Sequence, residues 1–203
     1  MTISASLCLI LGGWLTCASH LQALDFRLQK LHNEAAEGNS IDYYFNDDEL
    51  RIFYRPPVLW TSQGTAGEFV ARAPYPSEGR LMLRGITPVK TLPTPGTKEG
   101  LNAFRTHFAQ NLPEGAIAVR ALEIECDTVG GRELPATRAT FSYELKGNPR
   151  LQTLIYVGYR PDLWIEIRIE SHKEDFLRVK SAGLLSLEAF TEEARATANT
   201  AAN

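Results

Sequence analysis

The feature that most restricts the fold is a run of segments in the second half of the chain where apolar and polar side chains alternate. Four segments show this pattern, at 121–127, 135–144, 151–157 and 163–170. Side chains two apart in a strand point to the same face, so the pattern predicts strands. Gly130 and Gly131 mark one connecting turn, and 146–149 forms another. Strands joined by short turns pair antiparallel, so we expect an antiparallel sheet here.

The first half of the chain adds shorter strand-like segments. They lie at 50–54, 68–72 and 80–84. Pro and Gly residues separate them, which is typical of short strands joined by tight connections. A Pro- and Gly-rich connection then runs over 88–96 and leads into the middle of the chain.

Three segments have apolar residues three and four apart, the spacing of one helix face. They are 21–36, 99–111 and 172–185. In the first of them the apolar positions are Leu21, Leu24, Leu28, Leu31 and Ala35. Pro113 ends the second helix, because proline cannot continue a helical hydrogen-bond ladder. Strands followed and flanked by helices predict the α+β class, with residues 191–203 as a flexible tail.

The N-terminus has the order of a secretory signal peptide. Residues 7–15 are apolar and 16–19 are small, and the first charged side chain is Asp25. This order predicts cleavage after Ala18 or Ser19 and export of the mature chain to the periplasm or the extracellular space. No Lys or Arg precedes the apolar stretch, so an uncleaved membrane anchor is the alternative.

Charge and cysteine content narrow the class of protein further. The chain carries 21 Lys and Arg against 24 Asp and Glu, a net charge of -3, with the two signs interspersed. Nucleic-acid binders show a basic excess or stripe, so we expect no nucleic-acid partner. Cys8 and Cys17 lie in the predicted signal, which leaves Cys126 without a disulfide partner in the mature chain.

Several landmarks occur in an order that resembles a known family. They are FYRPPVLW at 53–60, Leu112-Pro113, LPATRATF at 134–141 and LWIEI at 163–167. Over residues 45–190 this order resembles the PsbP-like family, which includes the PsbP extrinsic subunit of photosystem II, the Mog-type Ran-binding protein and periplasmic DcrB-like proteins. The resemblance implies a central antiparallel sheet sandwiched by helices on both faces, a three-layer arrangement. It also implies a mostly non-enzymatic role in binding other proteins, and it transfers no functional residue.

The acidic row on segment 121–127 is a candidate metal site that its own geometry disfavours. Glu123, Glu125 and Asp127 share one strand face. They spread over about 13 Å at about 3.3 Å per residue, too far for one cation to reach all three. We therefore expect a solvated sheet face. Cys126, on the other face with Leu122 and Ile124, is expected to be a core residue.

The last predicted strand carries the candidate binding residues. Ile165, Ile167 and Ile169 form one face, while Trp164 and Arg168 lie on the other with Glu166 and Glu170. Trp164 either lies under a helix or long side chain or is an exposed anchor of the kind enriched at interfaces. We select Trp164 and Arg168 as partner-binding residues, with Arg168 exposed.

The sequence therefore favours an exported, non-catalytic binding or accessory protein that acts through contacts with another protein of the cell envelope. The expected organisation is a signal peptide at 1–19, an amphipathic helical lead at 20–40, a PsbP-like domain at 41–190 and the tail at 191–203. The sequence identifies no catalytic, cofactor-binding or metal-binding residue, and we expect no membrane insertion of the mature domain. Two alternatives remain: an enzyme or small-molecule carrier with a site in a cleft between sheet and helix, and an envelope-tethered structural protein.

Overall fold

A computed structural model describes residues 24–31, 42–47 and 50–194. The predicted signal peptide at 1–19 and residues 195–203 of the predicted tail lie outside the described residues.

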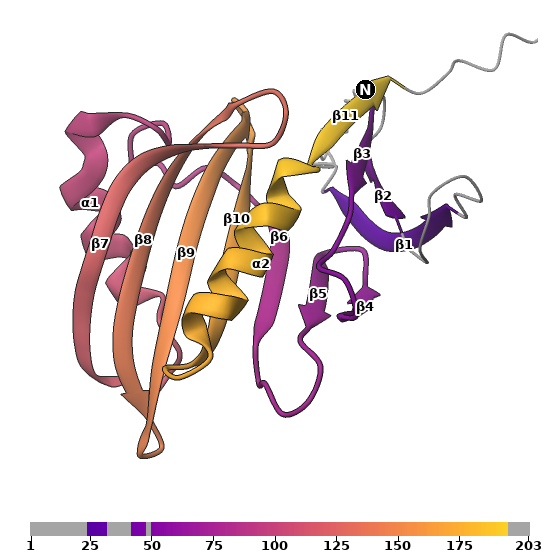
Figure 1. The fold of residues 1–203 in the computed structure, drawn as a ribbon. Coiled ribbons are helices and arrows are strands. Elements are labelled where there is room, and N and C mark those ends of the chain that lie inside the picture. Colours follow the sequence, from indigo (N-terminus) through magenta and orange to yellow (C-terminus); the bar gives the residue numbers. More distant parts are fainter. Residues whose placement is uncertain (1–23, 32–41, 48–49, 195–203) are drawn as a thin grey trace, which may run out of the picture.

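The larger of two antiparallel sheets contains the alternating segments of the second half (Figure 1). Its strand order is β4-β5-β6-β10-β9-β8-β7. The strands are β4 (Thr61–Gly64), β5 (Glu68–Arg72), β6 (Arg80–Ile86), β7 (Ile117–Val129), β8 (Leu134–Leu145), β9 (Asn148–Arg160) and β10 (Leu163–His172). Neighbours in sequence from β7 to β10 pair as hairpins, which confirms the antiparallel prediction for this half.

A second sheet of four strands pairs segments from both ends of the chain, in the order β1-β2-β3-β11. The strands are β1 (Asp25–Leu31), β2 (Asp42–Asp47), β3 (Leu50–Tyr54) and β11 (Thr191–Ala194). The helix predicted over 21–36 is therefore wrong at β1, where Phe26 is buried and Arg27 exposed as in a strand. The flexible tail predicted from Thr191 is wrong for its first four residues, which form β11.

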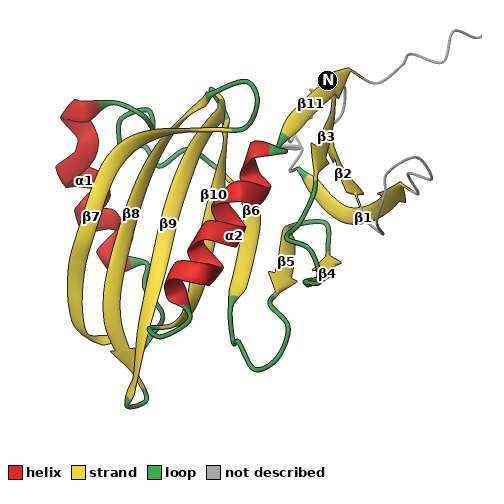
Figure 2. Ribbon diagram, viewed as in Figure 1, coloured by secondary structure: helices red, strands yellow, loops and turns green. Residues whose placement is uncertain are grey.

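Two helices and one 3₁₀ turn complete the described part of the chain (Figure 2). The turn η1 (Lys98–Gly100) leads into α1 (Leu101–Gln110), and α2 (Phe176–Glu188) follows β10. Both helices confirm the predictions at 99–111 and 172–185. Phe104 and Phe108 pack α1 against β8, β9 and β10. Val179 and Leu187 pack α2 into the other core cluster, together with Ile167.

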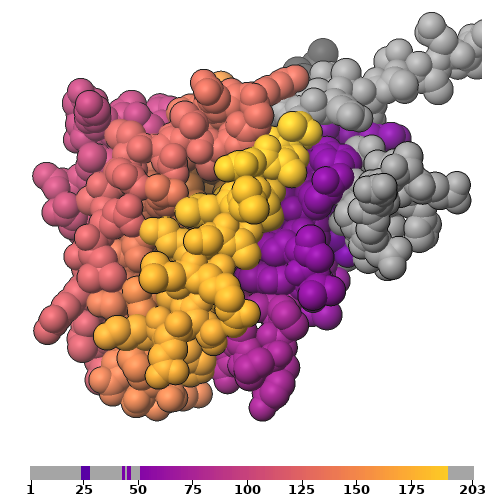
Figure 3. Space-filling view, viewed as in Figure 1, coloured from indigo at the N-terminus to yellow at the C-terminus, as the bar shows by residue number. Residues whose placement is uncertain are grey.

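The described chain is mostly β structure, so the α+β prediction holds only in its coarse form. Two short helices contact the larger sheet, and the second sheet covers part of it instead of a helical layer. A sheet enclosed by helical layers on both faces is therefore not shown. On one side of the molecule α2 runs diagonally, between β7–β9 and the N-terminal strands (Figure 3).

The core joins the two sheets through aromatic side chains. Phe45 of β2 stacks on Tyr54 of β3, and Phe69 of β5 meets both rings with centroids 5.3 Å away. The Tyr54 hydroxyl and Ser186 Oγ of α2 form a hydrogen bond of 2.9 Å. Burial of aromatic rings contributes much of a core's stability, so these contacts fix the second sheet onto the larger one.

β10 alternates as predicted, but neither of its faces is exposed to solvent. Ile165, Ile167 and Ile169 are buried on the α2 side. On the α1 side Trp164 and Glu166 are also buried, so of the two alternatives for Trp164 the structure shows the covered one. β10 is a central strand, and α1 with its flanking loops covers this face, which sequence alternation alone cannot reveal.

Cys126 was predicted to be a core residue, but its strand β7 lies at the edge of the larger sheet. A register shift interrupts the pairing of β7 between Ala121 and Glu123. Leu122 is 57% exposed at this irregularity, whereas Ile124 packs against the cluster under α1. Cys126 is half-buried rather than a core residue, because only part of an edge strand is covered.

Candidate ligand pocket

The connection between β6 and α1 forms one wall of a pocket. Hydrogen bonds fix its course: Leu92 N–H donates to the Val89 carbonyl at 2.9 Å, and Gly96 N–H donates to Thr137 Oγ1 at 2.9 Å. A Cβ on Gly96 would lie 2.9 Å from Pro135 Cβ, so glycine allows this close approach to β8. The wall is therefore anchored to the sheet, and its prolines stiffen it further.

The opposite wall is the end of the β9–β10 hairpin. Trp164 of β10 pairs with Gly158 of β9 in the antiparallel register. Gly158 has no side chain, so the space beside the indole stays open. A Cβ there would meet Pro135 and Pro95 only at ordinary contact distances of 3.5 Å and more. The small residue and the large one opposite it both line the pocket.

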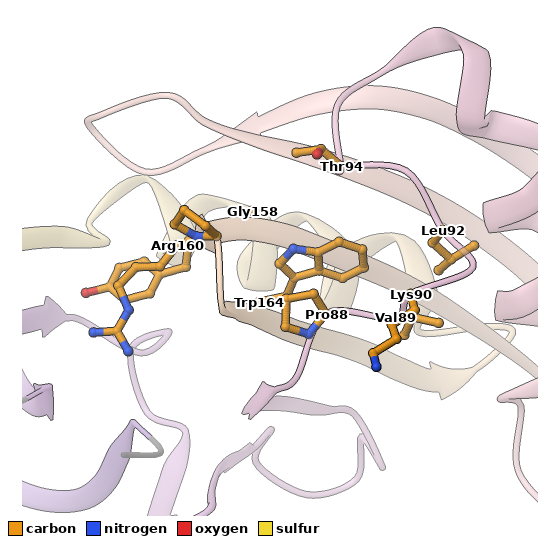
Figure 4. A pocket seen from close by; sticks show the side chains of 10 residues that line it. Pro88, Val89, Lys90, Leu92, Thr94, Gly158, Arg160 and Trp164 are labelled. Carbon is orange, nitrogen blue, oxygen red and sulfur yellow. The ribbon is translucent and has the colours of Figure 1, made fainter. Parts of the chain in front are cut away.

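The pocket has a volume of about 470 Å³ and is open to solvent on one side. From the β6–α1 connection it is lined by Pro88, Val89, Lys90, Leu92 and Thr94. From the hairpin it is lined by Gly158, Tyr159, Arg160, Pro161 and Trp164. Figure 4 shows the indole at the centre, with Lys90 and Arg160 on opposite sides of it. Small-molecule sites have volumes of about 300–1,000 Å³, so this pocket is of the right size.

The lining is apolar at the centre and cationic at its rim. Trp164 belongs to the cluster under α1, where its ring lies 6.3 Å from Phe104 and 6.0 Å from Tyr156. Arg160 lies over the Tyr159 ring at 5.8 Å and has Nε 3.4 Å from Asp162. Lys90 is exposed. The polar side chains of the lining are those of Lys90, Thr94, Tyr159 and Arg160, two of them cationic.

The structure separates the two predicted site residues. Trp164 lies under α1, the first of its two alternatives, and at 5% exposure it is not an exposed anchor. It also lines the pocket. Arg168 lies two strand repeats further along β10 on the same face, outside the pocket lining. Its side chain is 16% exposed, so the expectation that it is exposed is wrong.

Arg168 instead belongs to a buried ionic network beneath α1. It donates to Glu166 and, at 3.2 Å, to the Asn111 carbonyl, while Arg84 Nη2 donates to Glu166 Oε2 at 2.9 Å. Burial raises the pKa of Glu166, but the hydrogen bonds and charges of Arg168 and Arg84 outweigh it and leave that pKa below its usual value. The two arginines thus favour the ionised form of this buried carboxylate.

Tyr156 and His107 extend this network toward α1. The His107 ring nitrogen and the Tyr156 hydroxyl form a hydrogen bond of 3.0 Å. Burial raises the pKa of Tyr156, and the Glu166 charge adds to that effect. Burial lowers the pKa of His107, against the influence of the Glu166 charge. Both shifts favour the neutral form of the group, which serves as a structural hydrogen-bonding partner.

The acidic row of β7 lies on the α2 side of the larger sheet, opposite the network beneath α1, and its carboxylates pair with cationic side chains there. Glu123 accepts from Lys180 of α2 at 2.8 Å. Arg138 of β8 pairs with both Glu125 and Asp127. The prediction of a merely solvated face is thus incomplete, because a neighbouring strand and helix supply counter-charges that the local sequence does not show.

Sequence reasoning missed most of the pocket. Lys90 and Thr94 lie in the connection over 88–96 that the sequence marks only as Pro- and Gly-rich. Gly158 lies just after the predicted strand segment 151–157, and nothing in the local sequence marks it as part of a site. Only Trp164 carried a signal, as a large aromatic on the polar side of an alternating strand.

Comparisons with known proteins identify a distant likeness of fold. No family model and no curated protein sequence matches the chain. The solved structure of LpqN, described as involved in cell envelope biogenesis of Mycobacterium tuberculosis, is similar with a TM-score of 0.51 and 16% identity. It covers 76% of this chain and 92% of LpqN. At this identity the likeness shows the fold alone, and membership of the PsbP-like family is not confirmed.

A second solved structure, from Bacteroides thetaiotaomicron VPI-5482, has 14% identity and a TM-score of 0.40. The match covers 71% of this chain and 45% of that one. Within the described residues, no helix has the length and apolar character that crossing a membrane requires.

Proposed function

We propose that this chain is an exported accessory protein of the cell envelope that acts by binding, and that the pocket beside Trp164 is its binding site. The signal-peptide pattern at 1–19 supports export, and the order of landmarks supports a PsbP-like relationship. The binding act itself is non-catalytic. In this proposal the bound molecule is small, so the protein acts as a small-molecule carrier and not through a flat contact with another protein.

The observation that carries this proposal is the pairing of Gly158 with Trp164 in the β9–β10 hairpin. It places an open volume of about 470 Å³ against an indole, enclosed on the far side by the anchored β6–α1 connection. Preformed, mostly apolar concavities with a few polar groups are the usual form of ligand sites. A site that is rigid before binding loses little conformational entropy when a ligand enters.

The likeness to LpqN supports the envelope part of the proposal by analogy. LpqN is described as involved in cell envelope biogenesis, and the matched region extends over most of both chains. Fold does not fix function, so the pocket rather than the likeness carries the binding role.

The test is a comparison of what the protein retains when it is isolated from its native envelope. Native mass spectrometry of the wild type should show an added small-molecule mass. Gly158→Leu should lose this mass, because the new side chain fills the space beside Trp164. Thr94→Trp fills the pocket from an exposed lining position and should also lose the added mass. This second variant keeps the test valid if Gly158→Leu fails to fold.

Gly67→Leu is the matched control. Gly67 lies in an exposed turn where a Cβ would meet nothing within 4 Å, so the same substitution leaves the pocket intact. This control should retain the added mass. Retention of that mass in both pocket-filled variants would contradict the proposal.

A second candidate function is contact with another envelope protein through the edge strand β7. Ile117, Val119 and Leu122 are 59%, 41% and 57% exposed there. Edge strands with exposed apolar side chains are sites of strand addition. Crosslinking from Leu122 in the native envelope should capture one defined protein, and Leu122→Glu should abolish that product. An unchanged product in the variant would exclude this surface.

A further inference from the structure

The charge distribution around the pocket indicates what kind of small molecule it takes. Two cationic side chains, Lys90 and Arg160, lie on opposite sides of Trp164 (Figure 4). Asp162, adjacent to the lining, lies 3.4 Å from Arg160 Nε and offsets part of that charge. Lys90 is exposed and forms no ion pair with any residue that the structure describes. The rim is therefore positive on the Lys90 side.

The floor of the same pocket is apolar. Val89 and Leu92 belong to the connection that packs on the cluster under α1, and Trp164 is part of that cluster. An apolar group placed here would cover aliphatic and aromatic surface and remove it from water, which favours binding. A charged group would have no partner at this depth and would have to stay at the rim.

We infer that the pocket binds a small amphipathic acid, with its apolar part against Trp164 and its carboxylate beside Lys90. This inference rests on the proposed function, because it names the ligand class of the same site. A carboxylate satisfies Lys90 through a charge-assisted hydrogen bond, and Arg160 across the pocket adds to the favourable field. A neutral or cationic molecule of the same shape would make the apolar contacts but would not gain the attraction to Lys90 and Arg160.

Calorimetric titration with three probes of one chain length tests the inference: octanoate, 1-octanol and octylammonium. Octanoate should bind best to the wild type, and its affinity should fall with rising salt, as an exposed ionic contact requires. Lys90→Gln should weaken octanoate about three- to five-fold, the size of one exposed ion pair, and leave octanol unchanged. Lys90→Arg should restore octanoate binding.

Lys173→Gln is the control, because Lys173 is an exposed lysine before α2, outside the pocket lining, and its removal changes the net charge equally. Equal affinity for octanoate and octanol, or a preference for octylammonium, would overturn the inference. If Gly158→Leu still removed the native small-molecule mass in that case, the proposed function would stand while the acid class would fall. Absence of octanoate binding altogether would also overturn the inference.

Discussion

At the residue scale, the contrast between Arg168 and Arg178 shows how burial decides the value of an ion pair. Both arginines pair with a carboxylate, but Arg168 serves the buried Glu166, whereas Arg178 meets Asp175 at 2.7 Å with its side chain 64% exposed. An exposed pair contributes little, while a buried charge that loses a partner is costly.

We therefore predict that Arg168→Gln destabilises the fold by about 2–3 kcal/mol. Arg84 still pairs with Glu166 in this variant, which keeps the loss below that of a complete removal. Arg178→Gln, the matched control, should cost less than about 1 kcal/mol. Urea titration of both variants measures the difference, and equal losses would show that the network beneath α1 is not buried as described.

Glu166 makes stability depend on pH in a defined direction. Its pKa in the folded state lies below the usual value of 4.5, so the folded state binds its proton less tightly than the unfolded state does. The stabilisation is complete above pH 4.5 and is lost as the pH falls through the lower folded pKa. Glu166→Gln should remove this part of the acid sensitivity, measured as a smaller drop in unfolding free energy between pH 6 and pH 3 than in the wild type. An identical drop would contradict the assignment.

The residue scale is also where sequence reasoning was least complete. The alternation around Trp164 assigned the faces of β10 correctly, because a period of two follows from strand geometry. It could not tell that the polar-side residues Trp164 and Glu166 are buried, since the covering helix α1 comes from a segment more than 50 residues earlier. The alternation of apolar and polar residues shows which side chains share a face. Whether that face is buried depends on which segments, distant in sequence, pack over it.

At the element scale, the β7–β8 turn docks against the end of α2. Gly130 has a φ of +77°, and a Cβ there would lie 2.3 Å from the Phe190 carbonyl oxygen. The neighbouring Gly131 N–H donates to the same oxygen at 3.3 Å. The turn between β8 and β9 has a comparable glycine, Gly147 with a φ of +78°, where a Cβ would meet nothing within 4 Å.

These two glycines separate backbone strain from loss of contact. Gly147→Ala should cost about 1–2 kcal/mol, because only the left-handed conformation is penalised. Gly130→Ala should cost clearly more, because the turn must also move away from Phe190 and the start of β11. Thermal or urea unfolding of the pair measures this. Equal destabilisation would show that the turn does not pack on Phe190.

Elements joined by short turns were predictable, and elements paired across long distances in sequence were not. The hairpins from β7 to β10 follow from alternation and turn residues close together in the chain. β1 was predicted as a helix because its leucines also satisfy a spacing of three and four, and its partner β2 begins only at Asp42. β11 pairs with β3, about 140 residues earlier, so no local signal distinguishes it from a tail.

At the scale of the whole molecule, the pocket depends on parts that are remote in sequence. The β6–α1 connection, the end of β9 and the start of β10 meet only because β6 and β10 are neighbours in the larger sheet. A single sequence gives the strands but not this adjacency, which is why the candidate site could not be predicted beyond Trp164. The central claim is that this meeting place is occupied by a small molecule in the native envelope.

The indole N–H signal of Trp164 in a ¹⁵N-labelled protein tests this claim most directly, with Trp164→Phe identifying the signal and Trp60 as an internal reference. On addition of a small-molecule extract of the native envelope, the Trp164 signal should shift while that of Trp60 stays in place. The Trp164 shift should disappear in Gly158→Leu and persist in Gly67→Leu. A Trp164 signal that does not move while backbone signals elsewhere respond to the extract would contradict the account.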